Sequence, residues 1–154
     1  MHVKKRNGSL ETVDLNKIVR AVQRSCVELN VDAMRVATKT VSGLYDGATT
    51  RELDQLSIQT AAALIFEEPD YGRLAARLLA TVIEKEVQGQ QIYSFSQSIA
   101  AGHRLGLIGD RLYDVVTANA RKLNAAICNE NDTYFEYFGL RTVYDRYLLK
   151  NPES

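Results

Sequence analysis

Apolar residues recur at helical spacing along most of the first ninety positions of the chain. The first such face is formed by Leu15, Ile18, Val22, Cys26 and Leu29. It predicts a helix from about residue 15 to Asn30, and Asp14 is placed to cap its N-terminus. A second helix is predicted over 32–45, because Asp46-Gly47 interrupts the pattern that follows.

Two further helices follow, each with a clear N-terminal signal. Thr49 and Glu52 have the spacing of a capping box, which predicts a third helix that continues to about Phe66. Pro69-Asp70 opens the fourth, which we expect to end at Gly89. Its apolar face fits the helical template at every position and consists of Tyr71, Leu74, Ala75, Leu78, Leu79 and Val82.

The first residues alternate instead of following a helical period. Val3 lies on one side of Asn7-Gly8, and Leu10 and Val13 lie on the other. Asn-Gly favours a type I′ turn because both central residues need positive φ. We therefore predict a short β-hairpin from 1–5 and 10–13, so that the fold class is mainly α, with a small β element (α+β).

The segment "QGQQ" is a plausible boundary, and the pattern changes after it. Residues 92–108 and 110–127 predict two more helices, followed by the polar turn "CNENDT". The next stretch holds six of the chain's 8 tyrosines and 4 phenylalanines, and Asn151-Pro152 follows it. Because so apolar a segment needs a surface to pack against, we expect this chain to be a piece of a longer protein.

Composition narrows the function classes. The 154 residues are 45% hydrophobic and 25% charged, as in an ordinary soluble domain. Lys and Arg number 19 and Asp and Glu 19, so the net charge of +0 argues against a general nucleic-acid coat. Cys26 and Cys128 form no CxxC pair. With no signal peptide and no apolar membrane span, we expect a cytoplasmic protein with reduced cysteines.

The sequence contains no standard phosphate loop and no catalytic constellation, and its histidines, His2 and His103, are isolated. We therefore expect no catalytic residue and no metal ligand set. The remaining chemistry is basic. Lys5, Arg6 and Lys17 come together if the hairpin folds over the first helix, whose N-terminal amides also attract anions.

Three more side chains could complete such a site. Thr50 and Asp54 lie one turn apart on the third helix and suit a sugar or base edge, and Lys85 could add an ammonium group. The alternative is that all these charges are simply solvated, as surface charges usually are.

Three segments in order carry a family resemblance: "VKKRNGSLETVDLNKI", "YDGATTRELDQL" and "PDYGRLAARLL". Together they resemble an ATP-cone, the regulatory nucleotide-binding domain at the N-terminus of the large (alpha) subunit of class I ribonucleotide reductase. The resemblance covers residues 1–90. The segment "YFEYFGLRTVYDRYLLK" is similar to the part of that subunit that leads into its catalytic barrel, which would make 91–154 the adjoining helical region.

The resemblance implies a four-helix bundle capped by a small β-sheet, with the nucleotide held between cap and helix ends. It implies that Lys5 and Arg6 meet the triphosphate, that Thr50 and Asp54 hold the adenosine end, and that Lys85 contacts a phosphate. Contacts to base, sugar and phosphate are implied for Glu11, Thr12, Val13, Asp14, Leu15, Asn16 and Lys17. Mg²⁺ would bridge the phosphates, and the adenine would lie against Val3 and Ile18.

Two positions depart from the family pattern. Asn7 stands where the family usually has Asp, and some relatives carry His at the position of Asp54.

The implied function is allosteric. ATP or dATP would bind this domain and control the overall activity and oligomeric state of a reductase that makes deoxyribonucleotides for DNA synthesis. The implied partners are other large subunits and the small radical-generating subunit, with no nucleic acid and no membrane. Two alternatives stay open: the ATP-cone of a nucleotide-sensing transcriptional repressor, and a helical interaction domain without a ligand.

Overall fold

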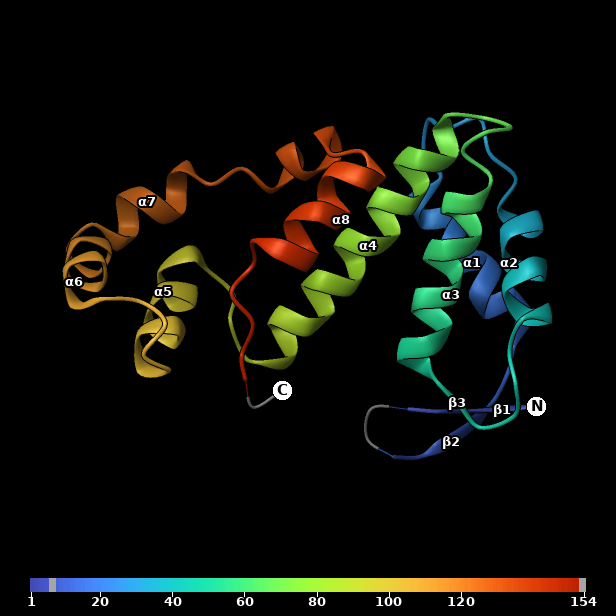
Figure 1. Cartoon of the computed structure of the whole chain (residues 1–154), viewed down its shortest axis with the longest axis horizontal. Helices are drawn as coiled ribbons and strands as arrows, with labels where there is room; N and C mark the ends of the chain where they lie inside the picture. Colours follow the sequence, from blue (N-terminus) through green and yellow to red (C-terminus); the bar gives the residue numbers. More distant parts are fainter. Residues whose placement is uncertain (6–7, 153–154) are drawn as a thin grey trace. The chain divides into compact units, whose positions relative to one another are not determined.

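Helices make up most of the fold (Figure 1). The structure is a computed structural model and describes residues 1–5 and 8–152. In chain order the elements are β1 (His2–Lys4), β2 (Leu10–Thr12), α1 (Leu15–Ser25), α2 (Ala33–Ser42), β3 (Ala48–Thr49), α3 (Thr50–Ala63), α4 (Asp70–Gly89), α5 (Phe95–Arg104), α6 (Asp110–Ala118), α7 (Ala120–Ala126), the 3₁₀ helix η1 (Asn129–Tyr134) and α8 (Tyr137–Arg146). The predicted fold class, mainly α with a small β element, is confirmed.

The chain divides into two compact units. The first consists of residues 1–82 with 133–141, and the second of residues 83–132 with 142–154. None of the helices in the described part of the chain is long and apolar enough to cross a membrane.

The first unit has its core among α1, α2, α3 and the first part of α4. The predicted apolar faces meet there, and the buried cluster consists of Ile18, Val19, Val22, Val36, Ala37, Ala61, Leu64, Tyr71, Leu74 and Ala75. Burial of this apolar surface is the main stabilising contribution to the unit. The four helices predicted before residue 90 are therefore all present.

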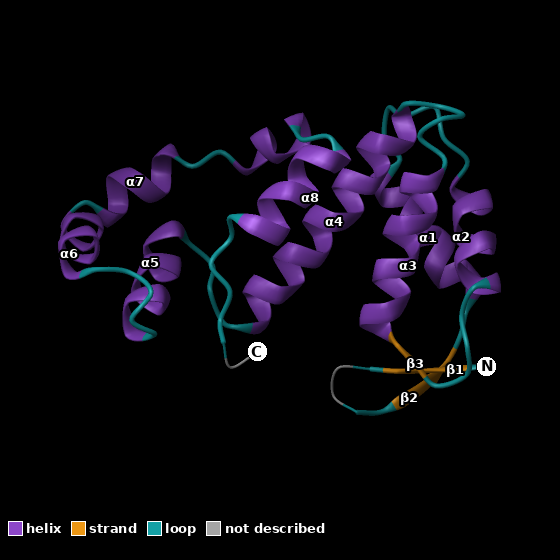
Figure 2. Cartoon of the chain, viewed as in Figure 1, coloured by secondary structure: helices purple, strands orange, loops and turns teal. Residues whose placement is uncertain are grey.

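A small sheet lies at the end of this bundle where α1 and α3 begin (Figure 2). The strand order is β2-β1-β3. The predicted hairpin is confirmed, with Val3 paired to Glu11 in the antiparallel register. The sequence analysis missed β3, which pairs with β1 in parallel. A two-residue strand is too short to show an alternating pattern, and its partner is distant in sequence.

The hairpin closes between Lys5 and Ser9. The Lys5 N–H donates to the Ser9 carbonyl at 2.8 Å, and the Gly8 N–H donates to the Lys5 carbonyl at 2.9 Å. Gly8 has φ +84°, which glycine adopts without strain. The predicted type I′ turn includes Asn7, which lies outside the described residues.

The ends of the first three helices differ from the prediction. α1 ends at Ser25 instead of Asn30. The Arg77 guanidinium donates to the carbonyls of Ser25 (3.0 Å) and Val27 (2.6 Å), so these carbonyls have a partner outside the helix. Glu28 then has φ 60°, which is incompatible with a continuing helix. α2 and α3 end at Ser42 and Ala63, a turn short of the predicted ends.

In the second unit the predicted helices are shortened or divided. The helix predicted over 92–108 is α5, and it ends before Gly106, which has φ +71°. The helix predicted over 110–127 is wrong as a single element, because Asn119 separates α6 from α7. The Asn119 side-chain amide donates to the Val115 carbonyl at 2.8 Å, which satisfies an acceptor at the end of α6.

The central part of the aromatic stretch forms α8, for which the sequence analysis named no element. Within the first unit, Tyr137 at its start packs against the core cluster. Within the second unit, the Tyr144 hydroxyl donates to Glu86 at 2.9 Å, and the Lys150 ammonium lies 4.2 Å from the centre of the Tyr144 ring. The aromatic side chains therefore divide their contacts between the two units.

We predict that Leu74→Ala destabilises the first unit. Leu74 is fully buried, so the substitution removes apolar contacts and leaves a cavity, which typically costs about 2–5 kcal/mol. Chemical denaturation followed by circular dichroism measures this loss. Leu112→Ala on α6 is the control, since Leu112 is 46% exposed and its truncation should change stability by less than about 0.5 kcal/mol. Equal losses in both variants would contradict this location of the core.

Candidate functional site

The register of the hairpin decides which polar side chains face the bundle. Val3 is buried, and Glu11 lies directly opposite it, so both side chains are on the helix side of the sheet. Lys5 follows Val3 by two residues and therefore faces the same way. Lys4 and Leu10 occupy the opposite, exposed face. The hairpin thus presents one cation and one carboxylate towards the start of α1.

Lys5, Glu11 and Lys17 form a compact group, called here the Glu11 cluster. The Lys5 Nζ lies 2.8 Å from Glu11 Oε2, and the Lys17 Nζ lies 2.7 Å from Glu11 Oε1. One lysine comes from the hairpin and the other from the first turn of α1. Two of the predicted anion-binding cations therefore come together, as the sequence analysis expected. That analysis named Glu11 as a nucleotide contact and not as the partner of both lysines.

The Glu11 cluster has one net positive charge and remains open to solvent. The side chains of Lys5, Glu11 and Lys17 are 43%, 33% and 62% exposed. Hydrogen bonds from Lys17 and then Lys5 hold the pKa of Glu11 at about 2, below its usual 4.5. Glu11 is therefore ionised throughout the physiological range, and the two ammonium groups are held together by a permanent negative charge.

Two helices begin beside the sheet, and each has its own cap. The predicted N-cap is confirmed, since Asp14 accepts a hydrogen bond from the Asn16 N–H at 2.9 Å. The predicted capping box is also confirmed: the Glu52 N–H donates to Thr49 Oγ1 at 3.1 Å, and the Thr49 N–H donates to Glu52 at 2.7 Å. Asp14 offsets part of the positive potential that the amides at the start of α1 provide.

Thr50 and Asp54 lie on the first turns of α3. The parallel register pairs Lys4 with Thr49, and Thr50 follows directly as the first residue of α3. Asp54 follows one turn later, on the same side of the helix. Both residues are partly buried, so a hydroxyl and a carboxylate stand at the same end of the unit as the Glu11 cluster.

The other predicted residues occupy different environments. Thr12, Leu15 and Asn16 are exposed, whereas Val13 packs against the core. Arg6 lies outside the described residues, and its phosphate contact stays a prediction.

Lys85 is an exposed residue of α4 and belongs to the second unit, so its contribution also stays a prediction. Val3 and Ile18 are only 5% and 7% exposed, which leaves little of their surface for an adenine ring.

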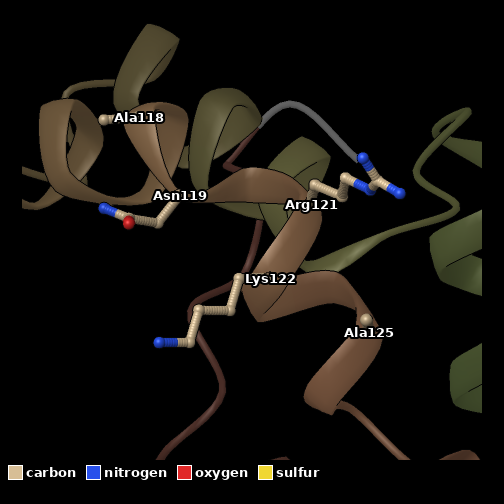
Figure 3. Close-up of a pocket in the computed structure, with 5 residues that line it drawn as sticks. All are labelled: Ala118, Asn119, Arg121, Lys122 and Ala125. Atoms are coloured by element: carbon tan, nitrogen blue, oxygen red, sulfur yellow. The ribbon is translucent and has the colours of Figure 1, made fainter.

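A second candidate is an open pocket where α6 meets α7 in the second unit. It is lined by Ala118, Asn119, Arg121, Lys122 and Ala125 (Figure 3). Figure 3 shows the Arg121 and Lys122 side chains extending in different directions, so they do not converge on one anion. Among residues 1–5 and 8–152, no three or more His, Cys, Asp or Glu side chains are grouped as metal ligands would be.

Residues 1–100 match the family model described as an ATP cone domain. The chain belongs to the ATP-cone family. The resemblance drawn from the three sequence motifs is thereby confirmed.

Relatives of this ATP-cone chain include the ribonucleoside-diphosphate reductase large subunits of Danio rerio and Caenorhabditis elegans. Each is 36% identical to it, over 159 and 158 residues, and each alignment covers 97% of this chain and 20% of the relative. The large subunit of Variola virus is 35% identical with the same coverage. The chain therefore spans about a fifth of the length of these relatives.

The sequence contained a signal for the bridging position of Glu11 that was not used. Once Val3 is placed inward, an antiparallel hairpin that closes between Lys5 and Ser9 puts Glu11 on the inner face, diagonal to Lys5. The contact with Lys17 needed the angle between hairpin and α1, which no local pattern encodes.

We predict that Glu11 of this ATP-cone titrates far below an ordinary glutamate. Because its pKa is lowered on folding, its contribution to stability is complete above pH 4.5 and is lost as the pH falls towards 2. Carboxyl chemical shifts in NMR should show Glu11 mostly ionised at pH 3.5, and Lys17→Ala should raise its midpoint towards 4.5. A midpoint near 4.5 in the unmodified protein would contradict the ion pairs.

Proposed function

We propose that this chain is the regulatory domain of a ribonucleoside-diphosphate reductase and binds ATP or dATP through the Glu11 cluster and the start of α3. The observation that carries the proposal is the convergence of Lys5 and Lys17 at one point, 2.8 and 2.7 Å from the same carboxylate. Two ammonium groups so placed suit the oxygens of a polyphosphate.

The neighbouring groups would set the orientation of the nucleotide in the site. The triphosphate would lie at Lys5 and Lys17, with Arg6 and Lys85 as further phosphate contacts. Thr50 and Asp54 would take the ribose and base, since a hydroxyl donor and a carboxylate acceptor match hydroxyl and amino groups. Glu11 to Lys17 would line the site between them. Mg²⁺ would enter with the nucleotide, held mainly by phosphate oxygens.

We propose residues 1–90 as the extent of this domain and 91–154 as the region that joins it to the catalytic part.

The regulation requires a difference between two ligands. ATP and dATP differ by one 2′-hydroxyl, so each must favour a different arrangement of the domain if they act differently. Coupling of about 1–3 kcal/mol is typical of allosteric systems. In this proposal ATP favours the active assembly of large and small subunits in the cytoplasm, and dATP favours an inactive oligomer.

A nucleotide-sensing transcriptional repressor is the second candidate for an ATP-cone. The matched relatives favour the reductase, because their alignments continue through 97% of this chain. The net charge of +0 also gives no general attraction to DNA. An electrophoretic mobility shift with and without ATP discriminates the two, and binding of DNA at physiological salt would favour the repressor.

We predict that Lys5→Ala and Lys17→Ala each weaken binding of ATP and dATP by about ten- to a hundredfold. The reason is the loss of a charge-assisted hydrogen bond to phosphate, which contributes about 1.5–3 kcal/mol in a favourable site. Isothermal titration calorimetry with Mg²⁺ measures the affinities and the stoichiometry, with GTP as the test of base selectivity.

Lys39→Ala is the matched control for these two variants. Lys39 is an exposed lysine on α2, and its removal changes the net charge equally without touching the Glu11 cluster. Unchanged ATP affinity in both cluster variants would contradict the assignment of the site. If no nucleotide raises the melting temperature of the unmodified chain, the remaining alternative, a helical interaction domain without a ligand, is supported instead.

A further inference from the structure

Glu11 occupies the place that the proposed function assigns to a phosphate group. Both of its oxygens are engaged, Oε2 with Lys5 at 2.8 Å and Oε1 with Lys17 at 2.7 Å. In an anion site of this kind, the ammonium groups would be expected to have no anionic partner other than the ligand. Here they are already neutralised in part by a side chain of the same domain.

We propose that Glu11 is a built-in competitor: its carboxylate pairs with the two lysines that would hold a phosphate, and it must be displaced from Lys5 and Lys17 when a nucleotide binds. This inference rests on the proposed function. It assigns Glu11 a role opposite to that of an ordinary binding residue, because its side chain opposes the ligand that its neighbours attract.

Charge repulsion is the first argument. A phosphate group that bridged Lys5 and Lys17 as the Glu11 carboxylate does would take the place of that carboxylate, and two anions in contact repel strongly. The carboxylate has one negative charge, whereas a triphosphate brings several. A polyphosphate therefore outcompetes Glu11 for the two lysines, while a singly charged anion has little advantage over it.

The second argument is that displacement costs little. Glu11 is fixed at its backbone by the pairing with Val3, but its side chain is 33% exposed and has rotatable bonds that lead to solvent. Exposed ion pairs of this kind contribute little to stability, because water and salt screen them. Their loss therefore leaves the buried core, on which the fold depends, unchanged.

Protonation is not an alternative way to release the lysines. With a pKa of about 2, Glu11 stays ionised at any pH at which a nucleotide would be met. The competitor is therefore removed by the ligand itself and not by a change in pH. It raises the nucleotide concentration at which the site fills, and it discriminates against anions of low charge such as inorganic phosphate.

The test compares Glu11→Gln with Glu67→Gln by calorimetry. The amide keeps the size of the side chain and removes its charge. Glu67 is another exposed carboxylate that is ion-paired, with Arg35 at 2.7 Å, and it lies in the loop after α3, at the end of the bundle remote from the sheet (Figure 1). Each substitution removes one negative charge from the same unit, and circular dichroism verifies that each variant is folded.

We expect Glu11→Gln to bind MgATP about three to ten times more tightly than the unmodified protein at low salt, since one exposed ion-pair partner and one repulsive charge are removed. Glu67→Gln should bind as the unmodified protein does. The affinity of Glu11→Gln should also fall more steeply with salt, because its site has two uncompensated cations.

Inorganic phosphate is the second probe. We expect it to compete with MgATP more effectively in Glu11→Gln than in the unmodified protein, since the competing carboxylate is absent. Equal or weaker MgATP binding by Glu11→Gln, with normal binding by the unmodified protein, would overturn the competitor role and leave the proposed function intact. If neither the unmodified protein nor Glu11→Gln bound MgATP, the proposed function itself would be overturned.

Discussion

Val3 is buried against the helices, and the antiparallel register sets Glu11 opposite it on the same side of the sheet. A slip of one residue would turn Glu11 outward and bring Lys4 or Leu10 to face the bundle, because strand side chains alternate between faces. Two features fix the register of β1: Val3 is buried, and it pairs in parallel with Ala48, which is fully buried. The position of the charged groups thus follows from apolar packing.

In the first unit, the groups that stabilise the fold are separate from the groups proposed to bind the nucleotide. Its stability comes from apolar side chains on four helices, and the polar groups of the Glu11 cluster lie outside that core. Exposed ion pairs contribute little to the stability of the fold and are screened by salt. Buried apolar contacts contribute most of the stability and carry no charge that salt could screen. The charges at the sheet can therefore change their partners while the bundle remains folded, which is the property a ligand-responsive domain needs.

The sequence alone was sufficient for the parts of the fold that local patterns encode. The periodicity of α4, the cap at Asp14 and the capping box of Thr49 with Glu52 all follow from residues close together in the chain, and the structure confirms them. The three family motifs were equally informative, since their order along the chain is far more specific than any one of them.

The features that were missed depend on residues distant in sequence. α1 ends early because Arg77, fifty positions away, satisfies the carbonyl of Val27. β3 is defined only by its pairing with β1. The bridging position of Glu11 needs both the hairpin register and the packing of α1 against the sheet. Helical period and capping signals contain none of this information, because it belongs to the tertiary structure.

The central place of β1 in the sheet has a mechanical consequence. β1 is hydrogen-bonded along both edges: β2 on one side continues directly into α1, and β3 on the other continues directly into α3. A force applied at the end of this strand, next to Lys5, is thus shared between two helices that are not consecutive in the chain. A displacement of β1 would therefore act on α1 and α3 together, although α2 lies between them in the chain.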